Sequence, residues 1–235
     1  MRRNFYRNLT IAFFITAITA NLVIADDYPA TLEAELKNTL QSVARDKTNL
    51  YLFTKIASLY LDLGTDVYSE KEKRLTAYDQ GARFAVRALE MNESIAEAHF
   101  LYAANLGSAA QLKGLMASAG VVQTLKRHLR RALELQDDHA PALHMMGAML
   151  DELPWFLGGD TKAALDSVKR AVAVDPNYAS ARLDLAKMYL KRQDPESAKK
   201  ELRTLIGLVH PRDQYAWANR YRPEGLRLLG ELSVD

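Results

Sequence analysis

The chain contains no cysteine among its 235 residues. That absence excludes disulfides, cysteine-based zinc sites and the acylated cysteine that anchors bacterial lipoproteins. A protein of this size without cross-links depends on hydrophobic packing, and the chain is long enough to bury a substantial core. Proline is scarce, with seven residues, and stretches in which Val, Ile or Thr alternate with polar residues are missing. We therefore expect an all-α protein.

Sequence motifs of known catalytic sites are missing as well. The five histidines show no metal-binding spacing. The chain has no nucleophile elbow, phosphate-binding loop or zinc signature. We therefore expect no catalytic residues, no metal and no cofactor, and a protein that is not an enzyme.

A large excess of charge of one sign is absent too. The whole chain has a formal net charge of +2, and residues 1–25 contain three arginines and no acid, which leaves −1 on residues 26–235. A nearly neutral domain lacks the electrostatic footprint of a nucleic-acid-binding protein. The basic cluster Lys126–Arg131 follows a helical apolar stripe, so we interpret it as the solvated face of a helix rather than a polyanion site.

The chain does contain a repeated pattern. It begins at Arg87, Arg131 and Arg170, and it reads Arg, Ala, aliphatic, any, aliphatic, polar, two turn residues, any, Ala, any, Ala. The starts lie 44 and 39 residues apart (131 − 87 and 170 − 131). Such a period marks stacked supersecondary units, and the pattern is typical of the junction between helical hairpins in tetratricopeptide arrays. The sequence predicts a solenoid of antiparallel helical hairpins, a fold that generally binds a partner.

The periodicity divides residues 26–235 into about four helix pairs and a C-terminal capping helix. The expected pairs are 51–63 with 75–91, 96–106 with 121–135, 141–152 with 161–174, and 179–191 with 195–209, followed by a cap over 214–232. Small residues such as Gly147 stand where paired helices are expected to cross. Two connections are longer than in a standard unit, Ser108–Gly120 and Leu153–Asp160, and long loops in a compact domain commonly have a function.

The loop Leu153–Asp160 combines turn residues with three consecutive large apolar side chains, those of Trp155, Phe156 and Leu157. The pair Gly158–Gly159 permits a tight turn with positive φ, and Asp160 can cap the following helix. Water disfavours exposed apolar groups, so either the array's own helices or a ligand or partner should cover them. Because the turn fixes the loop to the next helix, we expect the first alternative.

The repeat register places six side chains on the inner face of the array, namely Phe100, Ala104, Gly107, His144, Ala148 and Asp151. The small residues among them would leave space between helices. That space would be a groove for a peptide or a cavity for a small apolar ligand. Ordinary core packing is the default interpretation of these residues.

Residues 1–25 have the layout of a secretory signal peptide. Arginines at the start precede an apolar run from Leu9 to Ala25 that ends in a small residue. We expect cleavage after Ala25, which leaves residues 26–235 as the mature domain; an uncleaved anchor helix is the alternative. The sequence thus predicts a periplasmic protein that is not a lipoprotein and that meets the membrane only through this segment, before cleavage.

With repeats and loop assigned, residues 51–209 resemble the T-component of tripartite ATP-independent periplasmic (TRAP) transporters. The residues that carry the resemblance are Asn105–Gly107, Lys113–Gly114, Met146–Gly147, Glu152–Pro154, Leu157–Asp160 and Lys162–Ala163. Ordinary tetratricopeptide proteins lack the Leu-Pro…Leu-Gly-Gly-Asp loop. A more distant likeness, in the style of the repeats, is to eukaryotic regulators of microtubule dynamics, and the export signal argues against that role.

The resemblance implies an accessory protein that associates with the periplasmic substrate-binding protein of an uptake system. It also implies a pocket for a small hydrophobic ligand and a tendency to form homo-oligomers, and it adds Asn105 and Lys113 to the candidate binding residues. The alternative is a general tetratricopeptide scaffold for a peptide or an envelope protein. An apolar, closed inner wall would favour the small ligand, and a polar, open wall would favour the peptide.

Overall fold

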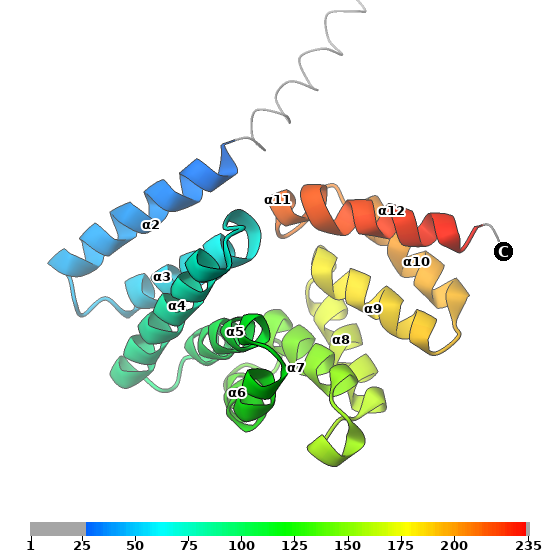
Figure 1. The fold of residues 1–235 in the computed structure, drawn as a ribbon, viewed down its shortest axis with the longest axis horizontal. Helices are drawn as coiled ribbons and strands as arrows, with labels where there is room; N and C mark the ends of the chain where they lie inside the picture. Colours follow the sequence, from blue (N-terminus) through cyan, green and yellow to red (C-terminus); the bar gives the residue numbers. More distant parts are fainter. Residues whose placement is uncertain (1–26, 234–235) are drawn as a thin grey trace, which may run out of the picture.

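The computed structural model describes residues 27–233, which Figure 1 shows as a curved succession of helices. The expected signal segment, residues 1–25, lies outside these described residues. Between residues 27 and 233 the chain forms helices, turns and loops but no β-strand. No helix in this range has the length and apolar character needed to span a bilayer.

In this part of the chain, one helix, α2 (Tyr28–Arg45), precedes four antiparallel pairs. The pairs are α3 (Leu50–Asp62) with α4 (Lys71–Met91), α5 (Ala96–Lys113) with α6 (Leu115–Leu135), α7 (Ala140–Glu152) with α8 (Thr161–Val174), and α9 (Ala179–Lys191) with α10 (Pro195–Ile206). The C-terminal cap consists of α11 (Gln214–Ala216), the π-helical turn η3 (Trp217–Tyr221) and α12 (Arg222–Glu231). A second π-helical turn, η1 (Leu63–Val67), follows α3, and a short 3-10 turn, η2 (Trp155–Leu157), lies between α7 and α8. The prediction of a tetratricopeptide-like solenoid is confirmed.

The pair α5 and α6 differs from the prediction. The sequence predicts a long connection over Ser108–Gly120, but α5 runs on to Lys113 and α6 begins two residues later. Gly114 alone forms the joint, with a φ of 107° that favours glycine. Ala109 and Ala110 are buried and are strong helix formers, so the helix continues where a loop was expected.

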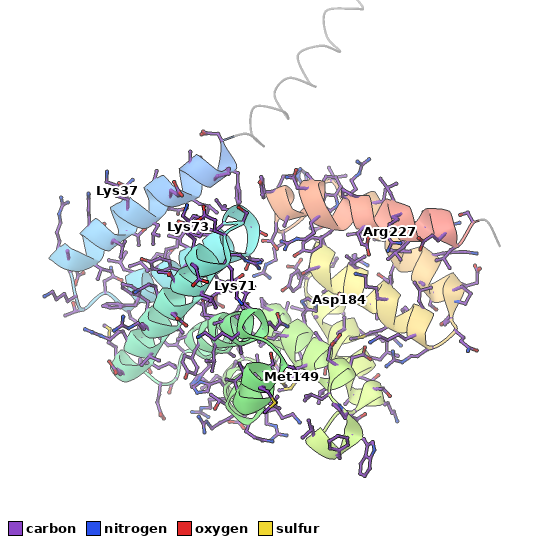
Figure 2. All side chains as sticks on the ribbon, viewed as in Figure 1. Lys37, Lys71, Lys73, Met149, Asp184 and Arg227 are labelled. Carbon is purple, nitrogen blue, oxygen red and sulfur yellow. The ribbon has the colours of Figure 1, made fainter. Side chains whose placement is uncertain are left out.

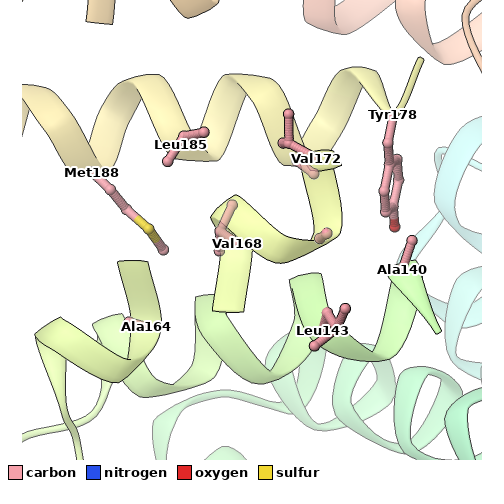
Figure 3. Close-up of a cluster of buried hydrophobic side chains, with 10 residues drawn as sticks. Ala140, Leu143, Ala164, Val168, Val172, Tyr178, Leu185 and Met188 are labelled. Atoms are coloured by element: carbon pink, nitrogen blue, oxygen red, sulfur yellow. The ribbon is translucent and has the colours of Figure 1, made fainter. Parts of the chain in front are cut away.

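The core consists of apolar clusters between successive helices. Figure 3 shows the cluster that joins α7, α8 and α9, in which Leu143, Val168 and Leu185 pack among buried alanines. Gly147 lies where α7 crosses α8, and a Cβ atom at this position would stand 2.5 Å from Cγ2 of Val168. The expected glycine crossing is confirmed, so the repeat register is right in this unit.

The array curves until its two ends meet. Figure 1 shows α11 beside the start of α2. The ring of Tyr28 in α2 stacks on that of Tyr215 in α11, with centroids 4.4 Å apart. Arg220 of η3 forms an ion pair with Asp66 of η1, 154 residues away in sequence. The two π-helical turns, an uncommon conformation, thus supply the charged pair that closes the array into a ring.

Candidate functional site

The loop Leu153–Asp160 is held from behind through its backbone. Lys126 of α6, whose exposed fraction is only 7%, donates hydrogen bonds to the carbonyl oxygens of Leu157 (3.2 Å) and Gly158 (2.9 Å). The sequence predicts a solvated basic cluster around this lysine, and Lys126 is the exception. A buried ammonium group that meets two carbonyl oxygens fixes the loop to α6.

The turn that ends the loop depends on its two glycines. Gly158 has a φ of 81°, and a Cβ atom on Gly159 would stand 1.8 Å from the carbonyl oxygen of Leu153. The carboxylate of Asp160 then accepts hydrogen bonds from two backbone N–H groups in the first turn of α8. The expected turn and helix cap are therefore confirmed.

The side chains at the end of this loop face solvent. We name the segment Trp155–Leu157 the apolar tip; the exposed fractions are 85% for Trp155, 67% for Phe156 and 44% for Leu157. The two aromatic rings meet edge to face with their centroids 5.9 Å apart. Our expectation that the array would cover these side chains is wrong, because the contacts that fix the loop involve carbonyl oxygens and glycines. Figure 1 shows the connection between α7 and α8 projecting from the array.

Two of the expected inner-wall residues, Ala104 and Gly107, are packed inside the array instead, as is Asn105 between them. Ala104 and Asn105 have exposed fractions of 7% and 0%. The side-chain nitrogen of Asn105 donates to the carbonyl oxygen of Ala57, 3.2 Å away in α3. A Cβ atom on Gly107 would stand 3.1 Å from Cε of Met145. Neighbouring side chains thus fill the space that a ligand cavity at these positions would need.

Other inner-wall residues make polar contacts between successive first helices. His144 of α7 lies 2.7 Å from the carboxylate of Asp184 in α9, and Asp151 of α7 pairs with Lys191 of α9 at 2.6 Å. Figure 2 labels Asp184 among the side chains that line the middle of the ring. The wall between α7 and α9 is therefore polar.

The remaining candidates do not meet at one place. Phe100 packs against the ring of His139, with centroids 5.3 Å apart, and Ala148 is half-buried. Lys113 pairs with Asp79 of α4 at 3.5 Å. Among the sequence-derived candidates, only the apolar tip forms a contiguous group of solvent-facing side chains.

A cluster of acids at the closure of the ring carried no signal in the sequence, because Asp213 lies far along the chain from Asp62 and Asp66. Burial raises the pKa of Asp62 to about 7, and the carboxylates of Asp66 and Asp213 add to the rise. Burial also raises the pKa of Asp66 and of Asp213, although Arg220 opposes both shifts. Within residues 27–233 no group of three or more His, Cys, Asp or Glu side chains could hold a metal ion.

The closure should weaken as the pH rises. The folded ring keeps the proton of Asp62 up to a pH of about 7, whereas an ordinary Asp loses it near 3.8, so this stabilisation is complete below about pH 4 and is lost above about pH 7. The variant Asp62→Asn should not lose it. We expect the thermal midpoint of the unsubstituted protein to fall relative to that of Asp62→Asn between about pH 5 and pH 8. The exposed control Asp138→Asn should show no such difference; the same behaviour in both variants would contradict the prediction.

Two family models match the chain. The model described as regulator of microtubule dynamics protein 1-3 matches residues 24–149, and a tetratricopeptide repeat model matches residues 156–218. The first match spans more than half of the chain.

Curated relatives agree with the first model. Regulator of microtubule dynamics protein 1 of Bos taurus is 34% identical over 146 residues, which cover 55% of this chain and 46% of the relative. The protein of the same name from Homo sapiens has the same identity and coverage. The chain therefore matches about half the length of these relatives.

Solved structures support the fold alone, because their identities are low. TTC0263, a tetratricopeptide protein of Thermus thermophilus, has a TM-score of 0.61 at 14% identity and covers 92% of this chain and 97% of its own. MamA from Desulfovibrio magneticus RS-1 has a TM-score of 0.50 at 13% identity, with 80% of this chain and 92% of that chain covered.

These findings correct two predictions. The assignment to the TRAP T-component is wrong, because the chain matches a different family. That family, the regulators of microtubule dynamics, is the one to which the repeats showed only a more distant likeness. Association with a TRAP substrate-binding component loses its support with that assignment. The periplasmic location is also wrong, because the relatives are eukaryotic proteins; the cleavage site expected after Ala25 lies outside the described residues.

Proposed function

Because the chain belongs to the regulator of microtubule dynamics protein 1-3 family, we propose that it is a non-catalytic scaffold that binds a protein partner through the apolar tip Trp155–Leu157. The tetratricopeptide-like fold supports this role, since stacked helical hairpins present extended binding surfaces. We further propose that residues 26–235 act as one domain.

One observation carries the proposal. The backbone of the loop is fixed by Lys126 and by a glycine turn, while Trp155 is 85% exposed. A preordered loop loses little conformational entropy on binding. Full burial of a large apolar side chain contributes roughly 1.5–3 kcal/mol, and tryptophan is enriched among the residues that dominate interface energies. The tip therefore combines a large gain on burial with a small cost of ordering.

The relatives suggest the class of partner. Their name, regulator of microtubule dynamics, supports a partner in the microtubule system. The chain matches only about half of their length, so this assignment is a proposal for the part of the protein that we describe. The probe we choose is therefore microtubules polymerised from purified tubulin.

The double substitution Trp155→Ala/Phe156→Ala should abolish binding and spare the fold. Both side chains are mostly exposed, so the thermal midpoint should change little. Loss of a central interface aromatic commonly costs about 2 kcal/mol or more, so loss of both should weaken binding about a thousandfold, beyond what cosedimentation detects. Cosedimentation with microtubules measures the binding, and circular dichroism checks the fold.

The matched control is Leu115→Ala/Met116→Ala at the start of α6, where two apolar side chains are 85% and 86% exposed. This control should sediment as the unsubstituted protein does. Equal loss in both variants would mean that the tip has no special role. If the unsubstituted protein fails to sediment, the partner is not the microtubule itself.

A small hydrophobic ligand within the array is a weaker proposal. Asn105 and Gly107 are buried against neighbouring side chains, and the wall between α7 and α9 is polar. A second copy of the chain could also cover the apolar tip. Light scattering of the double variant decides this alternative. If the unsubstituted protein is a dimer and the substitution dissociates it, the tip is a homo-oligomer interface.

A further inference from the structure

A groove with an apolar floor lies between α2 and α4. Its volume is about 670 Å³. The floor includes Phe53 of α3, and one end is formed by Tyr102 and Leu106 of α5. The groove is separate from the apolar tip, which projects between α7 and α8.

The groove lies along the part of α2 that α3 does not cover. The α2 residues Leu32 and Leu36 are buried against α3. One and two turns further on, Leu40 and Val43 remain half-buried, as does Phe84 across the groove in α4. No helix is stacked over this side of α2 in the described part of the chain, so apolar side chains line an open groove.

The charged side chains that line this groove are all basic. They are Lys47 in the turn after α2 and Arg83 and Arg87 of α4, with no Asp or Glu among the lining residues. Arg87 lies 3.6 Å from Glu90, in an exposed pair of low strength. Lys47 and Arg83 form no ion pair within residues 27–233. The groove therefore offers unpaired positive charge beside apolar surface.

The basic surface continues from the groove along α6. Tyr102 packs against the ring of His128 in α6, with centroids 4.5 Å apart. Burial and the neighbouring His99 lower the pKa of His128 to about 4, so that ring is neutral at pH 7. The neighbours of His128 on the surface of α6 are Arg127 and Arg130, both exposed. An occupant that leaves the groove at Tyr102 would thus meet Arg127 and Arg130, with Glu93 and Glu134 beside them.

We propose that this groove binds an acidic amphipathic helix of a partner protein. Its apolar side chains enter between Leu40, Val43 and Phe84, and its carboxylates meet Lys47 and Arg83, in the helix-in-groove mode. Apolar side chains that protrude from a peptide helix can fill a recessed apolar floor. A nucleic acid, whose backbone is charged throughout, fits such a floor less well. A membrane surface is bound best by apolar side chains that protrude from a protein, whereas those of this groove are recessed.

The probe is a fluorescein-labelled amphipathic peptide with Leu and Phe at helical spacing and Glu at the other positions. Fluorescence anisotropy should show saturable binding to the unsubstituted protein that weakens with added salt. Charge reversal in Lys47→Glu/Arg83→Glu should weaken binding about tenfold or more, because like charges then face each other. A peptide with Lys in place of Glu should not bind.

Two control variants test whether binding is specific to this groove. Arg203→Glu, an exposed cation of α10, should bind the peptide as the unsubstituted protein does. Trp155→Ala/Phe156→Ala should also keep peptide binding, so that this proposal and the proposed function fail independently. Circular dichroism confirms that the charge-reversed protein is folded.

Three results would overturn the proposal. The unsubstituted protein could fail to bind the acidic peptide, or bind the Lys peptide equally well. Binding could also survive the double charge reversal. A further outcome is that no peptide binds, that anionic phospholipid vesicles do, and that the same substitutions remove vesicle binding. The groove would then bind a membrane surface instead of a peptide.

Discussion

Replacement of Gly147 by leucine should lower the stability of the array more than any other substitution proposed for its core. A Cβ atom at this position would already stand 2.5 Å from Cγ2 of Val168 and 2.8 Å from the carbonyl oxygen of Ala164. The second contact is with backbone, so relief requires α7 and α8 to separate. Over-packing of a well-packed core costs about 1–3 kcal/mol, and a displaced helix adds to this. The thermal midpoint, followed by circular dichroism, should fall by several degrees or the protein should fail to fold.

The control for this substitution is Gly120→Leu in α6. A Cβ atom at Gly120 would meet nothing within 4 Å, and the residue is exposed. Leucine there should be neutral or slightly stabilising, because it is a better helix former than glycine. If Gly147→Leu melts like the unsubstituted protein, the repeat register is wrong.

Lys126→Met should weaken partner binding without touching the apolar tip. Methionine keeps the apolar stem but removes the hydrogen bonds to the carbonyl oxygens of Leu157 and Gly158. The three residues of the tip would then have to be ordered on binding, at roughly 1–2 kcal/mol of backbone entropy per residue. We therefore expect binding weaker by about a hundredfold or more, while the array itself stays folded. Cosedimentation measures the affinity, and proteolysis at the loop reports its release.

Lys200→Met, which removes an exposed lysine of α10, controls for the loss of one positive charge. It should bind as the unsubstituted protein does. A Lys126→Met protein with full affinity would show that the preordering of the loop contributes nothing, even if Trp155 itself contacts the partner.

The sequence predicts the helices well because their signal is local and repeated. The pattern that starts at Arg87, Arg131 and Arg170 fixes the register, and Gly147 then falls at a helix crossing as expected. Helix α2, which lies outside the predicted pairs, is one exception. The expected loop over Ser108–Gly120 is another. Its prediction rests on the length of the unit, but the alanines of that segment favour helix and Gly114 suffices for the turn.

The candidate site could be predicted only in part, because the exposure of a side chain depends on contacts with distant residues. The glycine turn and the cap at Asp160 follow from local residues and are present. Nothing local to Trp155 shows that Lys126, far back in the chain, holds the loop by its carbonyl oxygens. The contact between Tyr28 and Tyr215 is likewise invisible in the sequence, since it joins the ends of the array.

The family was harder to identify than the fold. The loop residues that resemble the TRAP T-component serve the turn geometry, as Gly159 shows by its approach to Leu153. Similar geometric demands can arise in different families, so such a motif discriminates poorly between them. The interpretation of residues 1–25 as an export signal then weighs against the family to which the chain belongs.

The most direct test of the account is the solvent exposure of Trp155 in the free and the bound protein. The chain has two tryptophans, and Trp217→Phe leaves Trp155 as the only one. Incorporated as 5-hydroxytryptophan, this residue can be excited at wavelengths where neither the eleven tyrosines of the chain nor the tryptophans of tubulin absorb. Acrylamide should quench its fluorescence readily in the free protein, where the side chain is 85% exposed, and much less when saturating microtubules are bound. Strong protection in the free monomer, or unchanged quenching in a saturated complex, would contradict a binding role for the apolar tip.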